Sequence, residues 1–202
     1  MKGDTKIGVI ILAAGSSSRL GYPKQLVEFR GKSLLQHSID VADSLHFDVQ
    51  ILLMGAKAGE ILKKIECRNF EIVINDNWKE GIGTSISKGI FEALHLQNDL
   101  DYVLILLSDQ PFITTEKIRE IIRVKLESKK SATFSEYLGE AGVPAIFSKE
   151  TFSDLQELKK DQGAKKLILK NRIEFELVKF EGGNFDVDTA ADVDFLKRLE
   201  EE

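Results

Sequence analysis

Residues 7–26 read Ile7-Gly-Val-Ile-Ile-Leu-Ala-Ala-Gly-Ser-Ser-Ser-Arg-Leu-Gly-Tyr-Pro-Lys-Gln-Leu26. The first six residues are apolar or small, and they predict a strand that is buried on both faces. A loop of small residues follows, and it carries two cations, Arg19 and Lys24. In open α/β sheets, ligands bind where such strands end. This stretch therefore predicts both an α/β sheet and a ligand loop at its edge.

The same alternation of apolar runs and helical patterns continues along the chain. Further strands are predicted at 49–54, 71–74 and 102–107, and helices at 33–45, 56–65, 84–96 and 115–127. Strands that lack a polar face, separated by helices of roughly 10–15 residues, indicate a parallel sheet covered on both sides. The crossovers between such strands are right-handed. The predicted fold class is α/β, a three-layer, doubly wound and mostly parallel sheet.

After about residue 130 the pattern is less regular. Strands are predicted at 131–137 and 143–147 around a turn at 138–142, then helices at 149–158 and 162–169, a strand at 175–180 and a helix from about 190. We interpret this half as the end of the same sheet with an elaboration over residues 131–185. The chain, residues 1–202, is thus expected to form a single domain.

Composition narrows the function classes. The chain has 202 residues, with 28 Lys plus Arg against 33 Asp plus Glu, and 43% of its residues are hydrophobic. An ordinary apolar content excludes a disordered chain, and the acidic balance argues against a nucleic-acid binder. Cys67, the single cysteine, requires no oxidising compartment. The run from Ile7 to Ala14 is too short to span a bilayer, so we expect a cytoplasmic protein without a membrane partner.

The loop after the first strand has the chemistry of a phosphate site. Gly15 and the serines that follow let the backbone approach a ligand, and consecutive N–H groups can form an anion nest. Arg19 and Lys24 add cations suited to a triphosphate. A solvated loop with two surface charges is the alternative. The loop is neither a Walker A sequence nor a dinucleotide fingerprint.

Acidic residues follow the strand at 102–107 and recur near the C-terminus. Asp109 should emerge at the same sheet edge as the loop, and a hard divalent ion that binds phosphate needs one or two carboxylates there. Asp186 and Asp188 alternate along an extended segment and therefore point to one side, where they could complete a Mg²⁺ shell.

Each of these acidic groups has a structural alternative. Asp109 could cap the turn before the helix that begins near Thr114. Thr189-Ala-Ala-Asp192 is similar to a capping box at the start of the last helix, a role compatible with metal binding by Asp186 or Asp188.

Residues 12–26 resemble the Leu-Ala-Ala-Gly-x-Ser-x-Arg-x-Gly-x-x-Lys-Gln-Leu signature of the MobA-like nucleotidyltransferases, in particular the molybdenum cofactor cytidylyltransferases. Further segments are similar to other motifs of that family: Asn77-Trp-Lys-Glu-Gly-Ile-Gly-Thr-Ser-Ile86, Ser108-Asp-Gln-Pro111, Gly142-Val-Pro144, Asp161-Gln-Gly-Ala-Lys165 and Phe185-Asp-Val-Asp-Thr189. The resemblance thus covers nearly the whole chain. It departs at Val143, where the family has His on the acceptor side, and at Ala190, where it has Pro.

The resemblance implies the Rossmann-like fold of the nucleotide-diphospho-sugar transferase type, with residues 1–130 as the nucleotide-binding part and 131–185 on the substrate side. It also implies a Mg²⁺-dependent transfer of CMP from CTP to the terminal phosphate of molybdopterin, with release of pyrophosphate. A client molybdoenzyme, or its chaperone, is a possible partner. The choice of CTP depends on Ala14, because guanylyl-transferring relatives usually carry Gly there.

Within this hypothesis the loop binds the phosphates, Arg19 the β/γ end, and Lys24 the charge that develops around the α-phosphate. By resemblance, Gly81 and Ser85 hold the base and ribose. The residues expected to bind the nucleotide are Leu12, Ala13, Ala14, Gly15, Ser16, Ser17, Arg19, Lys24, Gly81 and Ser85. Those expected to be catalytic are Arg19, Lys24 and Asp109, and those expected to bind metal are Asp109, Asp186 and Asp188. For Thr84 and Ser85, a helix N-cap is the plain alternative.

Two rival functions stay open. One is a cytidylyltransferase for a sugar phosphate or for methylerythritol phosphate, which shares the Leu-Ala-Ala-Gly start. The other is a non-catalytic nucleotide sensor, or a chaperone that holds a finished cofactor. Pure binding seldom needs two cations and two groups of carboxylates, so these residues favour the enzyme.

Overall fold

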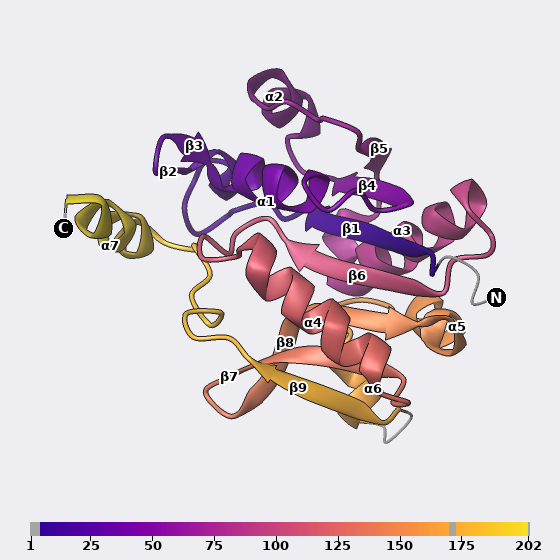
Figure 1. The fold of residues 1–202 in the computed structure, drawn as a ribbon. Coiled ribbons are helices and arrows are strands. Elements are labelled where there is room, and N and C mark those ends of the chain that lie inside the picture. Colours follow the sequence, from indigo (N-terminus) through magenta and orange to yellow (C-terminus); the bar gives the residue numbers. More distant parts are fainter. Residues whose placement is uncertain (1–4, 170–172, 202) are drawn as a thin grey trace.

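The computed structural model describes residues 5–169 and 173–201. A seven-stranded sheet with the order β5-β4-β1-β6-β8-β7-β9 forms its centre (Figure 1). Among the described residues, β8 alone runs antiparallel to its neighbours in this sheet, so the predicted mostly parallel sheet is confirmed. The strands are β1 (Ile7–Ala13), β4 (Val49–Met54), β5 (Glu71–Ile74), β6 (Tyr102–Leu107), β7 (Ala132–Tyr137), β8 (Glu140–Ser148) and β9 (Phe175–Lys179).

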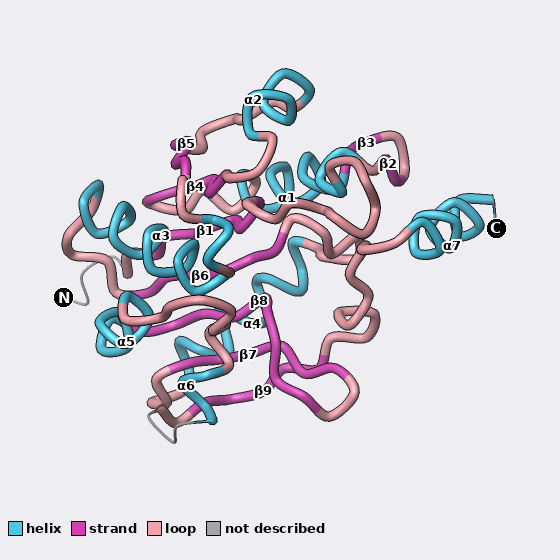
Figure 2. The backbone as a smooth tube through the Cα atoms, turned by 180° about the vertical axis from the view of Figure 1, so that it is seen from behind, coloured by secondary structure: helices cyan, strands magenta, loops and turns pink. Residues whose placement is uncertain are grey.

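Helices cover both faces of the sheet. On one face lie α1, α2 and α4, and on the other lie α3, α5 and α6 (Figures 1 and 2). The α-helices are α1 (Leu34–Asp43), α2 (Ala58–Ile61), α3 (Ile82–Leu96), α4 (Thr115–Glu127), α5 (Phe152–Gln156), α6 (Lys166–Leu169) and α7 (Ala190–Glu201), and the 3₁₀ turns are η1 (Lys24–Leu26), η2 (Leu62–Lys64), η3 (Trp78–Glu80) and η4 (Lys149–Thr151). This arrangement confirms the three-layer prediction.

Strand β1 shows why its sequence lacks alternation. Val9 and Ile11 pack into the core under α1 and α4, whereas Ile10 and Leu12 pack into the core under α3. All four side chains are buried, because helices exclude water from both faces of the strand. The apolar run is thus what a central parallel strand requires.

The structure differs from the predictions in three connecting segments. The helix expected at 56–65 is divided into α2 and η2, and the helix expected at 162–169 is reduced to α6. The turn expected at 138–142 contains only two residues, Leu138 and Gly139, which both have positive φ (53° and 77°). A two-residue turn of this kind fits the right-handed twist of a hairpin, so β8 begins three residues earlier than predicted.

A small hairpin that was not predicted binds the C-terminal helix. Strands β2 (Glu28–Phe29) and β3 (Lys32–Ser33) pair antiparallel after η1, and α7 lies beside them (Figure 1). Phe29 and Leu34 from this region form a third apolar cluster with Val187, Val193 and Leu196. This packing brings the segment before α7 close to the loop that follows β1.

In the described part of the chain, no helix has the length and apolarity needed to cross a bilayer.

Candidate active site

A cavity of about 360 Å³ opens at the carboxyl edge of the sheet, where β1 and β6 end. Its wall is formed by residues from several segments that are distant in sequence: Leu12, Ala14, Gly15, Ser16, Lys24, Gln25, Trp78, Lys79, Gly81, Ile82, Ser85, Leu107, Ser108, Asp109 and Asp161. Eight of the predicted site residues are in this wall, namely Leu12, Ala14, Gly15, Ser16, Lys24, Gly81, Ser85 and Asp109. The predicted residues Ala13, Ser17, Arg19, Asp186 and Asp188 are not in it.

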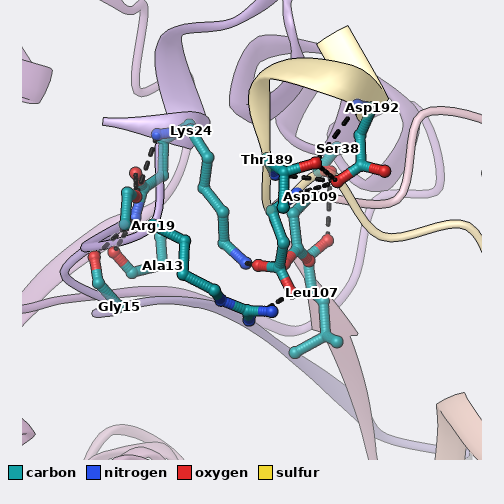
Figure 3. Close-up of polar contacts among 12 residues, drawn as sticks. Ala13, Gly15, Arg19, Lys24, Ser38, Leu107, Asp109, Thr189 and Asp192 are labelled. Atoms are coloured by element: carbon teal, nitrogen blue, oxygen red, sulfur yellow. Dashed lines mark hydrogen bonds and ion pairs between the residues drawn. The ribbon is translucent and has the colours of Figure 1, made fainter. Parts of the chain in front are cut away.

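Lys24 connects two of the predicted carboxylates. Its Nζ forms an ion pair with Asp109 and lies 2.6 Å from Oδ1 of Asp188 (Figure 3). Burial alone would lower the pKa of Lys24, but the charges of the two carboxylates outweigh it and raise this pKa above its usual value. The ammonium group is therefore held in its charged form at the mouth of the cavity.

Arg19 extends toward the same carboxylate from the other side. Its Nη2 lies 2.6 Å from Oδ2 of Asp188, and its side chain is 69% exposed. Burial opposes ionisation of Asp188, but Lys24 and Arg19 together lower the pKa of its carboxyl group. Arg19 thus lies at the rim of the site, where its exposed guanidinium group pairs with Asp188 through Nη2.

Backbone contacts fix Asp109 at the end of β6. The hydroxyl of Ser38 in α1 donates to the carbonyl of Leu107, and the Ser108 N–H donates to the carbonyl of Leu12. Asp109 is 7% exposed, and its Oδ1 atom is buried without a hydrogen-bond partner in the described residues. The turn-capping alternative for Asp109 is wrong, because within the described residues its Oδ1 has no hydrogen-bond partner and its Oδ2 pairs with Lys24.

Asp186 is placed beside Asp109 by the backbone between them. The N–H of Val187 donates to the carbonyl of Asp109, which brings the 186–188 segment to the end of β6. Loss of hydration around the Asp186 carboxyl, together with the charge of Asp109, raises its pKa to about 6, although part of the side chain stays exposed. Two carboxylates with this mutual repulsion favour a cation between them.

The predicted capping box at the start of α7 is confirmed. Oδ2 of Asp192 accepts from the N–H groups of Asp188 and Thr189, and the Thr189 hydroxyl accepts from the Asp192 N–H (Figure 3). The cap holds the backbone of Asp188 and therefore helps to aim its carboxylate at Lys24.

The opposite wall of the cavity is formed by the start of α3. Gly81 has a φ of 109°, and a Cβ on it would lie 2.4 Å from the backbone of Lys160, so the segment around Asp161 packs directly on this turn. Ser85 is 3% exposed and accepts from the Asn75 amide. The capping alternative for Thr84 and Ser85 is wrong, because Gly81 is the N-cap and no side chain caps the helix.

Three polar residues of this region had no predicted role in the site. Gln25 belongs to the motif after the first strand, but no pattern signals that its side chain contacts the loop backbone. Gln110 donates to the carbonyls of Val143 and Gly183, and Asp161 reaches the cavity from a segment 80 residues beyond Gly81. Such contacts between distant segments leave no periodic signal in a single sequence.

Comparison with known proteins places the chain in a family. The MobA-like NTP transferase domain matches residues 9–174. The chain is 27% identical to the purine catabolism protein PucB of Bacillus subtilis over 209 residues, which cover 98% of both proteins. It is 33% identical over 146 residues to the bifunctional protein GlmU of Buchnera aphidicola, covering 71% of this chain and 31% of that protein. The chain thus spans about a third of GlmU.

A solved structure agrees over nearly the full length. Rv0371c of Mycobacterium tuberculosis superimposes with a TM-score of 0.81 at 28% identity, covering 98% of this chain and 99% of the other. A second structure of that protein, a complex with manganese, has a TM-score of 0.79 at 26% identity and covers 95% and 98% of the two chains. The family match over residues 9–174 shows that the chain belongs to the MobA-like NTP transferase family.

Proposed function

We propose that the chain transfers CMP from CTP to the terminal phosphate of molybdopterin and releases pyrophosphate, as a single cytoplasmic domain. The observation that carries this proposal is the meeting of Lys24, Asp109 and Asp188 beside the small-residue loop at the carboxyl edge of the sheet. The chemistry of phosphoryl transfer needs positioning and neutralisation of charge, and this cluster offers both.

A divalent metal ion fits the acidic residues of the site. Oδ1 of Asp109 is buried without a partner, and burial, together with the charge of Asp109, raises the pKa of Asp186. A cation between the two carboxylates would neutralise this charge. Among the described residues, no group of three His, Cys, Asp or Glu side chains is placed to bind a metal. Mg²⁺ commonly takes only one or two carboxylates and completes its shell with water and substrate phosphates. The manganese complex of Rv0371c supports a divalent ion in this fold.

We assign the metal to Asp109 and Asp186, because Asp188 is already engaged by two cations. When bound, Mg²⁺ would neutralise phosphate charge and polarise the phosphoryl oxygens. The chain's own residues would bind the phosphates and stabilise the developing charge. Gly15 and Ser16 would surround the phosphates, Lys24 would stabilise the charge around the α-phosphorus, and Arg19 would meet the β/γ end after leaving Asp188.

The transfer itself needs no general base from the protein. An oxygen of the acceptor phosphate attacks the α-phosphorus, the bond from that phosphorus to the bridging oxygen breaks, and pyrophosphate leaves with the electron pair. A phosphate monoester is largely ionised near neutral pH, so its oxygen is already a nucleophile. Asp109, Asp186 and Lys24 therefore act by holding charge and orientation.

The acceptor would approach from the side of residues 131–185. A second cavity of about 370 Å³ lies there, and Tyr137, Lys179 and Phe180 are in its wall. Burial, and then the charge of Asp186, raises the pKa of the Tyr137 hydroxyl, which indicates that this wall lies close to the acidic site. Val143 stands where the family has His, so an apolar side chain replaces a polar one on this side.

Calorimetric titration with CTP and with GTP, each in Mg²⁺ and in EDTA, tests the proposal. We expect metal-dependent binding that favours CTP by at least about tenfold, or about 1.4 kcal/mol. Preference for GTP would contradict the role given to Ala14, but the proposed nucleotidyltransferase activity would stand. The variant Ala14→Gly should narrow the preference for CTP, because Ala14 lies in the cavity wall.

A further inference from the structure

The side chain of Gln25 lies under the phosphate loop and contacts it at three points. Gln25 is 1% exposed and follows Lys24 in η1. Its Nε2 donates to the carbonyl of Ala13 at 3.0 Å and to the carbonyl of Gly15 at 3.2 Å. Its Oε1 faces the hydroxyl of Ser17 at 3.4 Å. Both hydrogens of the amide group are therefore used on loop carbonyls, which also fixes the orientation of the amide.

These contacts determine which backbone groups of the loop, carbonyl oxygens or N–H groups, face the cavity. A carbonyl oxygen that pointed at a phosphate would repel it, whereas a carbonyl that accepts from Gln25 is held toward the buried side of the loop. The N–H groups of Gly15, Ser16 and Ser17 donate to no protein acceptor within residues 5–169 and 173–201. Since Gly15 and Ser16 are in the cavity wall, their N–H groups are available to an anion there.

The same side chain supports a strained residue. Ser17 has a φ of 54°, a left-handed conformation that costs a non-glycine residue roughly 1–2 kcal/mol. The Ser17 hydroxyl accepts from the Lys24 N–H at 2.9 Å and faces Gln25, so it joins the loop to the turn that carries Lys24. These two contacts fix the position of Lys24 relative to the loop.

We propose that Gln25 is a positioning residue that holds the 13–17 loop in its phosphate-accepting conformation by binding the Ala13 and Gly15 carbonyls. This inference rests on the proposed function, because it assumes that the loop binds the phosphates of a nucleotide. Gln25 lies in the cavity wall, but its amide group is already engaged by the loop carbonyls. It acts through the backbone of the loop and through the attachment of Lys24.

The decisive variant is Gln25→Met, which keeps the length and approximate volume of the side chain and removes both donors. The matched control is Gln50→Met, because Gln50 is a buried glutamine at the start of β4, opposite to the carboxyl edge of the sheet. The probe is magnesium pyrophosphate, measured by calorimetry beside Mg–CTP and CMP. Pyrophosphate tests the phosphate loop without any contribution from the base.

We expect Gln25→Met to weaken pyrophosphate and CTP by at least about tenfold, or about 1.4 kcal/mol, and to change CMP affinity much less. Gln50→Met should leave all three affinities unchanged. A uniform loss for the three probes would indicate a general structural defect and overturn the proposal, as would unchanged pyrophosphate binding by Gln25→Met. Should Gln25→Met fail to fold, Gln25→Asn, which keeps the amide but is one methylene shorter, must show the same selective loss.

The experiment separates this inference from the proposed function. If the wild-type chain binds none of the nucleotides or pyrophosphate, the proposed function fails. If the wild type binds them and the Gln25 variants bind equally well, the proposed function stands and the positioning role of Gln25 fails.

Discussion

At the scale of single residues, Lys24 is the side chain on which the site depends most. It contacts carboxylates from β6 and from the segment before α7, and its raised pKa keeps it charged over the whole neutral range. A fixed ammonium that faces developing charge contributes more to the transition state than to the bound substrate. Lys24 should therefore affect the rate more than the affinity.

We expect Lys24→Ala to lower kcat about 10²- to 10³-fold and to weaken CTP binding much less. Steady-state kinetics combined with calorimetry measures the two effects separately. Lys6→Ala is the matched control, since Lys6 pairs with Asp99 at the opposite end of β1. An unchanged kcat in Lys24→Ala would remove this residue from the mechanism.

Asp186 gives a prediction on stability against pH in the metal-free protein. Burial and the charge of Asp109 raise its pKa from the usual 3.8 to about 6, so the folded state binds the proton more tightly than the unfolded state does. The ionised carboxylate therefore destabilises the fold above pH 6, and this cost disappears as the pH falls toward 4. Asp186→Asn removes the charge at every pH.

In EDTA, we expect Asp186→Asn to unfold at a higher temperature than the wild type at pH 7.5, and the difference to be much smaller at pH 4.5. Differential scanning calorimetry at the two pH values measures this. An equal shift at both values would mean that the carboxyl group is not under electrostatic stress in the folded state.

At the scale of elements, the turn before α3 joins the two halves of the cavity wall. Gly81 needs its positive φ, and a Cβ would overlap the backbone of Lys160. We expect Gly81→Ala to reduce the free energy of unfolding by at least about 2 kcal/mol, since strain and overlap act together. Nucleotide affinity should fall as well, because the 160–161 segment must move.

Gly59→Ala is the control for this substitution, because a Cβ on Gly59 would meet no atom within 4 Å in the described structure. It lies in α2, where Ala is the better helix former, so the change should stabilise the protein by up to about 1 kcal/mol. Urea unfolding measures both variants. Equal free energies of unfolding for the two variants would show that the packing of Lys160 on Gly81 does not restrict the side chain at position 81.

The elements that could be predicted from the sequence are those marked by an apolar run or by a helix cap. β4 and β6 have the bounds that their apolar runs predict. α4 also has the predicted bounds, and its start is fixed by the Thr114 cap. The hairpin of β2 and β3 was missed, since two-residue strands carry no pattern. The helix at 56–65 was wrong in length, because it begins after Lys57, whose φ of 54° is not helical.

The site was predicted less completely than the strands. Strand ends indicate which residues meet at the carboxyl edge, and this reasoning placed Asp109 beside the loop. The ion pair of Lys24 with Asp188 joins residues 164 positions apart and depends on how α7 packs, which no local pattern encodes. For the same reason, the roles of Gln25 and Gln110 became visible only in three dimensions.

At the scale of the whole molecule, the C-terminal helix completes a site that the N-terminal strand begins. α7 lies beside β2 and β3 (Figure 1), where Val193 and Leu196 pack on Phe29 and Leu34. This contact holds Asp188 opposite Lys24. The last helix is therefore part of the active-site architecture.

We expect Leu196→Ala to cost about 2–5 kcal/mol of stability, since Leu196 is fully buried. Activity should fall at temperatures where the rest of the protein is folded, because α7 no longer positions Asp188. Leu126→Ala, at a position 46% exposed in α4, is the control and should change little. Urea unfolding followed by an activity assay measures both. Equal effects of the two variants would contradict the role of α7.

The most direct test of the central claim is pyrophosphate release from CTP in the presence of molybdopterin and Mg²⁺, compared between the wild type and Asp109→Asn. Asp99→Asn is the control, because Asp99 lies at the opposite edge and pairs with Lys6. We predict release by the wild type and by the control, and loss of nearly all release in Asp109→Asn. Undiminished release by Asp109→Asn, or none by the wild type with CTP, would contradict the account.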